Sequence, residues 1–220
     1  MAGRIPPTRE EHPLPAIIMH GVHLTSLILL VFTGFYINSP FFGGAMGYMI
    51  TIHQIAMWTF VLTTVTRLYW AFFGAGSAPP GGRVKGPDYK WFSPLRRTGE
   101  SKPRETIKYY LFLRDTYPSV YKFNPLQKYT YLLWAFILIP LSFLTGLALW
   151  APTRGLFAPM TNVLGGLAAM RTYHYLIMWA FIITVGVHIY LTMAEVLREW
   201  RMMFAWREPK APESRASSQG

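Results

Sequence analysis

Four long apolar stretches dominate this sequence and restrict the folds that are open to it. They run approximately over residues 14–37, 48–73, 129–151 and 172–197. An α-helix needs roughly 20 apolar residues to cross about 30 Å of hydrocarbon, and each stretch reaches or exceeds that length. Only helices and closed barrels cross a bilayer, because its core offers no water to backbone polar groups. We therefore expect an all-α membrane protein built as a four-helix bundle.

The composition agrees with a membrane protein. Of the 220 residues, 52% are hydrophobic and 14% are charged, whereas soluble domains carry about 25% charged residues. The 21 Lys and Arg residues outnumber the 10 Asp and Glu residues, which gives a net charge of +11. In so apolar a chain this excess is better explained by membrane orientation than by nucleic-acid binding. We expect lipid as the surroundings and no nucleic-acid partner.

The positive charges are concentrated in the segment between the second and third stretches. That segment, residues 74–128, carries eleven of them: Arg83, Lys85, Lys90, Arg96, Arg97, Lys102, Arg104, Lys108, Arg114, Lys122 and Lys128. Residues 38–47 carry no charge, and residues 152–171 carry only Arg154 and Arg171. The positive-inside rule then places both termini and this long loop in the cytoplasm. We expect a multi-pass protein of the inner (cell) membrane.

We expect one transmembrane domain over residues 1–200 and a flexible cytoplasmic tail over residues 201–220. The first stretch is too long for the apolar region of a signal peptide and lacks a small-residue cleavage site, which indicates a retained helix. Within the long loop, residues 104–114 have the pattern of a short amphipathic helix at the membrane surface.

The chain contains no cysteine. This excludes disulfides, thiolate-ligated iron–sulfur clusters and the cysteine attachment of c-type haem. A metal or cofactor must therefore be held by the six histidines, the ten carboxylates or noncovalent packing.

Five of the six histidines fall within the apolar stretches: His20, His23, His53, His174 and His188. An ionisable residue inside a membrane is a functional hypothesis by default, and the alternative is a neutral imidazole bonded to a neighbouring helix. In the topology above, His53 and His174 lie near the outer face, and His20 and His188 lie nearer the cytoplasm. The histidines therefore pair by depth.

The spacing of these histidines suits two stacked cofactors. His174 and His188 are fourteen residues apart, which places them within about 40° on one helix face and roughly 21 Å apart along its axis. Imidazole is a usual axial ligand of haem iron, and helix bundles build cofactor sites from inward side chains. We predict two b-type haems, the outer one ligated by His53 and His174 and the inner one by His20 and His188. Depth alone does not separate His20 from His23.

Two further residues lie at the predicted haem levels. Gly34 stands fourteen residues after His20, at the outer level, where a missing side chain admits a porphyrin or allows close helix packing. Arg67 stands fourteen residues after His53, at the inner level. It either pairs with a haem propionate or extends its charged end to the cytoplasmic surface.

Glu195 is a candidate for quinone contact or proton transfer. It lies seven residues after His188, about 20° from the same face and roughly 10 Å nearer the cytoplasm. The alternative is a solvated carboxylate paired with Arg198, three residues later.

Short motifs along nearly the whole chain resemble the cytochrome b subunit of respiratory nickel–iron hydrogenases, which is related to that of formate dehydrogenase. In chain order they are His20 with Thr33-Gly34, Met46-Gly47-Tyr48 with His53, Arg67-Leu68-Tyr69-Trp70, Asn124-Pro125, Thr145-Gly146-Leu147, Phe157-Ala158-Pro159, His174 with Met178-Trp179, and His188-Ile189-Tyr190. The chain departs from the family pattern at Gly21 and at the end of the fourth stretch, where only Glu195 remains of an Arg-Glu-Asp motif.

The resemblance implies that His20, rather than His23, is the ligand from the first helix. It also implies an electron-transfer subunit that anchors a periplasmic hydrogenase. Such a subunit receives electrons from the iron–sulfur small subunit and passes them through two haems to menaquinone or ubiquinone near the cytoplasmic face.

Two alternatives remain at this stage. In the first alternative, the same type of cytochrome serves a formate- or thiosulfate-type respiratory oxidoreductase. In the second, the chain is a haem-free four-helix anchor or transporter. The sequence shows no nucleophile–base pair and no phosphate-binding glycine loop. Substrate chemistry at the electron-donating end is therefore expected in a partner.

Overall fold

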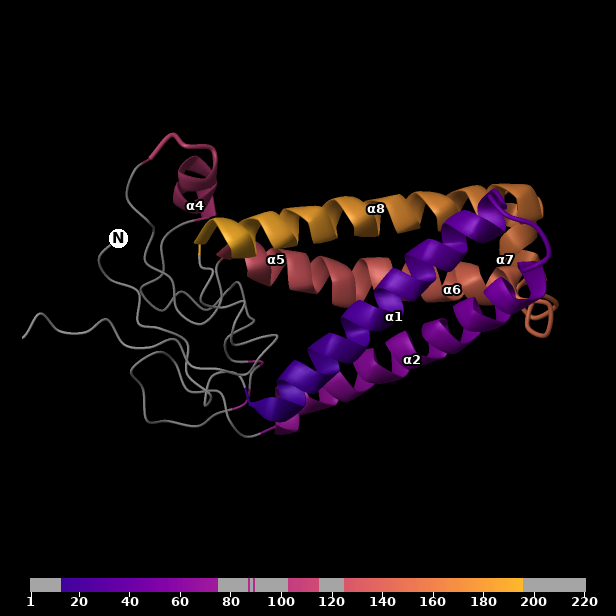
Figure 1. Ribbon diagram of the computed structural model, residues 1–220, viewed down its shortest axis with the longest axis horizontal. Helices are drawn as coiled ribbons and strands as arrows, with labels where there is room; N and C mark the ends of the chain where they lie inside the picture. The colour runs from indigo at the N-terminus through magenta and orange to yellow at the C-terminus, as the bar shows by residue number, and fades with distance from the viewer. Residues whose placement is uncertain (1–12, 75–86, 88, 90–102, 115–124, 196–220) are drawn as a thin grey trace, which may run out of the picture. The chain divides into compact units, whose positions relative to one another are not determined.

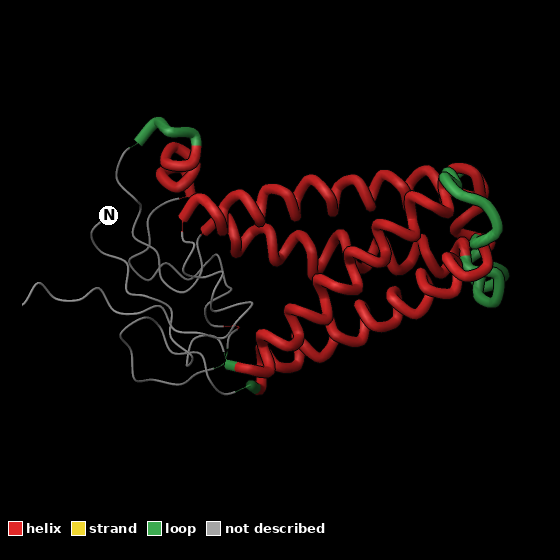
Figure 2. The backbone as a smooth tube through the Cα atoms, viewed as in Figure 1, coloured by secondary structure: helices red, strands yellow, loops and turns green. Residues whose placement is uncertain are grey.

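The computed structural model describes residues 13–74, 87, 89, 103–114 and 125–195. The predicted tail, His12 and Arg198 lie outside these residues. The described residues form helices and turns and contain no strand (Figures 1 and 2). The helices are α1 (Leu14–Asn38), α2 (Met46–Phe73), α4 (Pro103–Tyr110), α5 (Pro125–Leu133), the π-helix η1 (Trp134–Leu138), α6 (Ile139–Leu149), α7 (Ala158–Val163) and α8 (Gly166–Glu195).

Within the described part of the chain, four helical spans are long and apolar enough to cross a membrane: Leu14–Asn38, Met46–Phe73, Pro125–Leu149 and Gly166–Thr192. This confirms the predicted all-α fold. The third span begins four residues earlier than predicted, because a proline is well tolerated in the first turn of a helix. The fourth begins six residues earlier, directly after the turn at Gly165 and Gly166, whose φ angles of 97° and 85° favour glycine.

The third span is a continuous helix with a π-helical segment at its centre. Pro140 has no N–H for the carbonyl of Phe136, which lies inside η1. A local change to wider π geometry lets the helix continue past this interruption. Pro140 is visible in the sequence. The length of the apolar stretch alone did not predict the π-helix that precedes it.

The chain divides into two compact units, of which one comprises residues 19–68 and 127–189. In this unit α1 runs beside α2, and α8 beside α5–α6 (Figure 1). Edge-to-face aromatic contacts link the two pairs: Phe35 of α1 meets Trp179 of α8, and Trp58 of α2 meets Phe143 of α6. These contacts close the four helices into a bundle by van der Waals packing, which drives helix association in lipid.

The loop after α1 is fixed by Tyr36, which is only 1% exposed. Its hydroxyl donates a hydrogen bond to the carbonyl oxygen of Phe42 at 2.6 Å. The rings of Phe41 and Phe42 pack on the Tyr36 ring, with centroids 5.3 and 4.5 Å away. The uncharged loop is therefore ordered by one buried aromatic side chain.

The other unit contains α4 and the last turns of α8. Thr106 and Tyr110 form the buried face of α4, and the hydroxyl of Tyr190 donates to the carbonyl oxygen of Tyr110 at 3.1 Å. The amphipathic helix predicted over residues 104–114 ends at Tyr110. The chain turns at Phe112, whose φ of 59° closes the helix end in a left-handed conformation.

Replacing Tyr36 by Phe should loosen the loop between α1 and α2. A single hydrogen bond contributes about 0.5–1.5 kcal/mol, so the backbone amides of Ser39 and of residues 41–45 are expected to exchange several-fold faster. Hydrogen-exchange mass spectrometry measures this change. Tyr48→Phe is the control, because Tyr48 is 75% exposed, and equal exchange in Tyr36→Phe and the parent would contradict the assigned anchor.

Candidate functional site

His53 of α2 and His174 of α8 face one another inside the bundle. Their ring centroids are 6.3 Å apart and their planes are inclined by 67°. Two imidazoles that share one metal, each with a metal–nitrogen bond of about 2.0–2.1 Å as found for zinc, hold their centroids about 6 Å apart. The observed separation therefore fits one metal ion between the two rings.

Each of these rings is held through its Nδ1 atom by a buried threonine. The Oγ1 atom of Thr33 lies 2.8 Å from Nδ1 of His53, and Oγ1 of Thr145 lies 2.8 Å from Nδ1 of His174. Each hydroxyl donates its own hydrogen to the carbonyl four residues earlier, at 2.6 and 2.7 Å. The threonine oxygens must therefore accept the Nδ1–H bonds, which leaves both Nε2 lone pairs available to a metal.

A glycine follows each threonine and leaves space beside the adjacent imidazole. A Cβ atom at Gly34 would lie 3.8 Å from Cε1 of His53 and 3.1 Å from Sδ of Met178. A Cβ atom at Gly146 would lie 3.4 Å from Cε1 of His174. Both helices thus present bare backbone next to the rings, as a bulky planar group between them requires.

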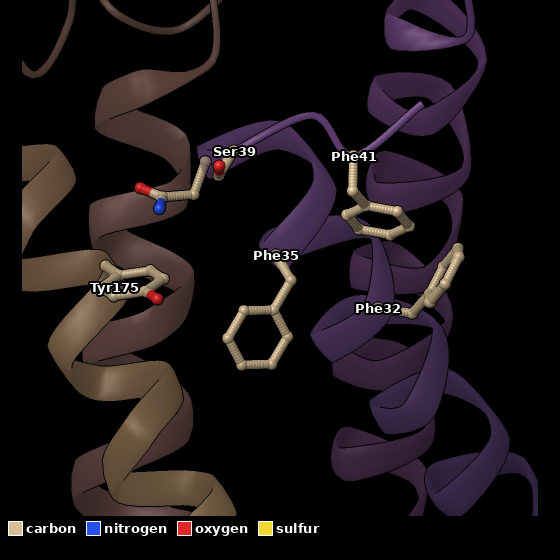
Figure 3. A pocket seen from close by; sticks show the side chains of 6 residues that line it. Phe32, Phe35, Ser39, Phe41 and Tyr175 are labelled. Carbon is tan, nitrogen blue, oxygen red and sulfur yellow. The ribbon is translucent and has the colours of Figure 1, made fainter. Parts of the chain in front are cut away.

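A pocket is lined by residues of α1, of the loop after it and of α8 (Figure 3). It measures about 460 Å³, and its lining residues are Phe32, Phe35, Asn38, Ser39, Phe41 and Tyr175. Phe35 follows Gly34 in the chain, Tyr175 follows His174, and the two aromatic side chains approach the cavity from α1 and α8.

The structure also brings together the residues predicted for the inner level. His20 on α1 interacts electrostatically with His188 on α8 and with Arg67 on α2. The ring of His188 contacts Tyr131 and Trp134, with centroids 5.8 and 5.4 Å away. Two histidines and one guanidinium from three helices therefore share this region of the bundle.

His23 is held in the opposite way from the outer histidines. Its Nε2 atom lies 2.9 Å from Oγ1 of Thr64, whose hydroxyl hydrogen is donated to the carbonyl of Phe60 at 2.8 Å. The Nε2 atom of His23 is therefore occupied by this hydroxyl. The nitrogen that remains available in His53 and His174 is therefore engaged in His23.

In the sequence, Thr33 and Thr145 are recognised only as parts of the family motifs, which do not predict their contacts with His53 and His174. The signal was present, because the same Thr-Gly pair occurs in the first and third apolar stretches. Glu195 is the last residue of α8, and its side chain lies outside what the structure describes.

Comparison with known proteins identifies the family. The model of the family described as prokaryotic cytochrome b561 matches residues 11–206. The chain belongs to this family. It is therefore an integral membrane cytochrome that transfers electrons, and the family name implies a b-type haem. The facing histidines, the free Nε2 positions and the bare glycine backbone fit that group.

Several curated proteins are similar over most of their length. A "Probable Ni/Fe-hydrogenase B-type cytochrome subunit" of Azotobacter vinelandii is 28% identical over 198 residues, which cover 82% of this chain and 78% of that one. A protein of the same name from Bradyrhizobium diazoefficiens is 28% identical, covering 86% and 79%. A "Putative protein-methionine-sulfoxide reductase subunit YedZ1" of Azospira oryzae is 30% identical, covering 81% and 87%.

Replacing Gly34 or Gly146 by Leu should lower the haem content of the purified protein. The new side chain would occupy the space beside His53 or His174. Haem absorbance per polypeptide measures the loss. Gly186→Leu is the matched control, since nothing lies within 4 Å of a Cβ atom there; unchanged haem content in both site variants would remove the packing role.

Proposed function

We propose that this chain is a di-haem b-type cytochrome that carries electrons from the iron–sulfur small subunit of a periplasmic nickel–iron hydrogenase to membrane quinone. The observation that supports it most strongly is the 6.3 Å separation of the His53 and His174 rings. Both rings have Nδ1 engaged by threonine and Nε2 available. Metal-binding histidines commonly have this arrangement, in which one nitrogen is hydrogen-bonded and the other ligates.

In this proposal His53 and His174 ligate the outer haem iron, and His20 and His188 ligate the inner one. His174 and His188 are separated by fourteen residues, or roughly 21 Å along α8, so two sites shorten the path across the hydrocarbon. When bound, the haems supply reversible one-electron redox chemistry. Arg67 is positioned near His20 to compensate the charge of a propionate, and the surrounding apolar side chains exclude water.

The charge distribution supports an orientation with both termini and the loop over residues 74–128 in the cytoplasm of an inner-membrane protein. The His53–His174 pair then lies near the periplasmic face, where electrons enter from the hydrogenase. The His20–His188 pair lies nearer the cytoplasmic face, where menaquinone or ubiquinone accepts them.

The choice of partner is supported by the relatives. The Azotobacter and Bradyrhizobium proteins carry the name of a nickel–iron hydrogenase subunit. The Azospira protein is named for a methionine-sulfoxide reductase and favours a second candidate, in which the same cytochrome serves another oxidoreductase. Mass-spectrometric identification of the subunit that copurifies with the full chain separates the two candidates.

Single substitutions of the four proposed ligands should remove the haems selectively. In His188→Ala or His20→Ala the inner spectral component should be lost, and in His53→Ala or His174→Ala the outer one. The measurement is a dithionite-reduced minus oxidised spectrum with haem quantified per chain, which should fall from two haems to one.

His23→Ala is the control for this series, because the Nε2 atom of His23 is engaged by Thr64. It should retain two haems. Loss of the inner component in His23→Ala but not in His20→Ala would reassign that ligand. If the folded parent protein binds no haem when haem is supplied, the di-haem proposal is contradicted and the interpretation as a haem-free anchor or transporter is favoured.

Glu195 is proposed to carry protons to the quinone, since it ends α8 and, in the proposed orientation, lies nearer the cytoplasm than His188. In membranes that contain the complete complex, hydrogen gas should reduce both haems and then quinone. Glu195→Gln should slow quinone reduction several-fold and leave the haem reduction rate unchanged. An unchanged quinone rate would instead assign Glu195 to ion pairing with Arg198.

A further inference from the structure

The outer histidine pair is built by one arrangement that occurs twice. Thr33 and Gly34 of α1 adjoin His53 of α2, and Thr145 and Gly146 of α6 adjoin His174 of α8. The two Oγ1–Nδ1 distances are both 2.8 Å. Thr33 and Thr145 are 1% and 8% exposed, so these hydrogen bonds lie in the interior of the bundle.

A third threonine shows which way the hydrogens point. Thr184 donates to two backbone carbonyls at 2.7 and 3.1 Å and receives the indole Nε1–H of Trp134 at 2.8 Å. Indole nitrogen can only donate. Thr145 has the same contacts with its carbonyls, at 2.7 and 3.1 Å, and Thr33 has them at 2.6 and 3.3 Å. His53 and His174 therefore occupy, relative to Thr33 and Thr145, the position that the Trp134 indole occupies relative to Thr184. By this comparison their Nδ1 atoms are donors.

We propose that Thr33 and Thr145 are matched positioning residues for the two ligands of the outer haem. This inference rests on the proposed function and deepens it. By accepting the Nδ1 hydrogen, each threonine selects the tautomer whose Nε2 lone pair is free, fixes the plane of the ring, and makes the imidazole a stronger electron donor to iron. The outer site is thus supported from both sides by equivalent bonds.

Thr64 shows that the position of the threonine decides which ring nitrogen of the histidine it meets. It bonds Nε2 of His23 rather than Nδ1. The same two residue types therefore occupy Nε2 in one histidine and Nδ1 in two others. The side of the ring that meets the hydroxyl distinguishes the cases.

The experiment uses the full-length, haem-loaded protein and replaces each threonine in turn by Val, which preserves shape and removes the oxygen. Thr33→Ala and Thr145→Ala are second oxygen-free variants in case Val disturbs folding, and Thr33→Ser and Thr145→Ser restore the oxygen. Thr59→Val is the matched control, because the hydroxyl of Thr59 donates to the carbonyl of Ile55, at 2.9 Å, and contacts no histidine.

The oxygen-free variants should shift the midpoint potential of the outer haem upward, because a weaker donor ligand stabilises the ferric state less. Outer-shell substitutions of this kind typically cost about 10- to 100-fold in metal affinity, so haem should also dissociate faster. The EPR g values of the outer haem should change, since they depend on the angle between the imidazole planes, which is 67° here. The inner haem should keep its potential, the Ser variants should return toward the parent, and Thr59→Val should change nothing.

Unchanged potential and g values of the outer haem in both Val and Ala variants would overturn the inference. So would an equal shift in Thr59→Val, which would indicate a general effect of losing a hydroxyl. These outcomes differ from failure of the proposed function, because that failure appears in the parent protein itself as fewer than two haems or as ligand variants that remove the wrong component.

Discussion

The absence of water inside the bilayer is the constraint on which the rest of this structure depends. Backbone groups satisfy one another within the helices, and every polar side chain there needs a protein partner. Threonine meets this condition by bonding a carbonyl of its own preceding turn, as Thr33, Thr64, Thr145 and Thr184 do. A hydroxyl oxygen that has donated its hydrogen in this way remains a fixed acceptor aimed at a neighbouring helix.

The fixed threonine acceptors distinguish the histidines by which ring nitrogen is hydrogen-bonded. An imidazole that donates through Nδ1 retains its outward nitrogen for a metal, and one that donates through Nε2 does not. The rings of His53 and His174 meet a threonine through Nδ1, and the ring of His23 meets one through Nε2. Burial alone makes no such distinction, because all three rings lie among apolar helices and would otherwise be equivalent candidates.

Much of the fold was predictable because membrane spans are specified by length and apolarity, and residues fourteen apart on a helix return to nearly the same face. The spans and the approach of His53 to His174 follow from these rules. The early start of the third span at Pro125 and the π-helix before Pro140 did not, since both depend on local backbone hydrogen bonds. Which ring nitrogen meets a threonine depends on how each helix is rotated about its axis. The spacing of residues along the sequence does not define that rotation.

The placement of each threonine also bears on the order in which the protein assembles. Thr33 and His53 belong to consecutive helices, as do Thr145 and His174, apart from the short α7 between them. Each hairpin therefore contains both members of one threonine–histidine pair. Both bonds lie within their own hairpins, so joining the hairpins leaves little further ordering of the His53 and His174 rings to be done.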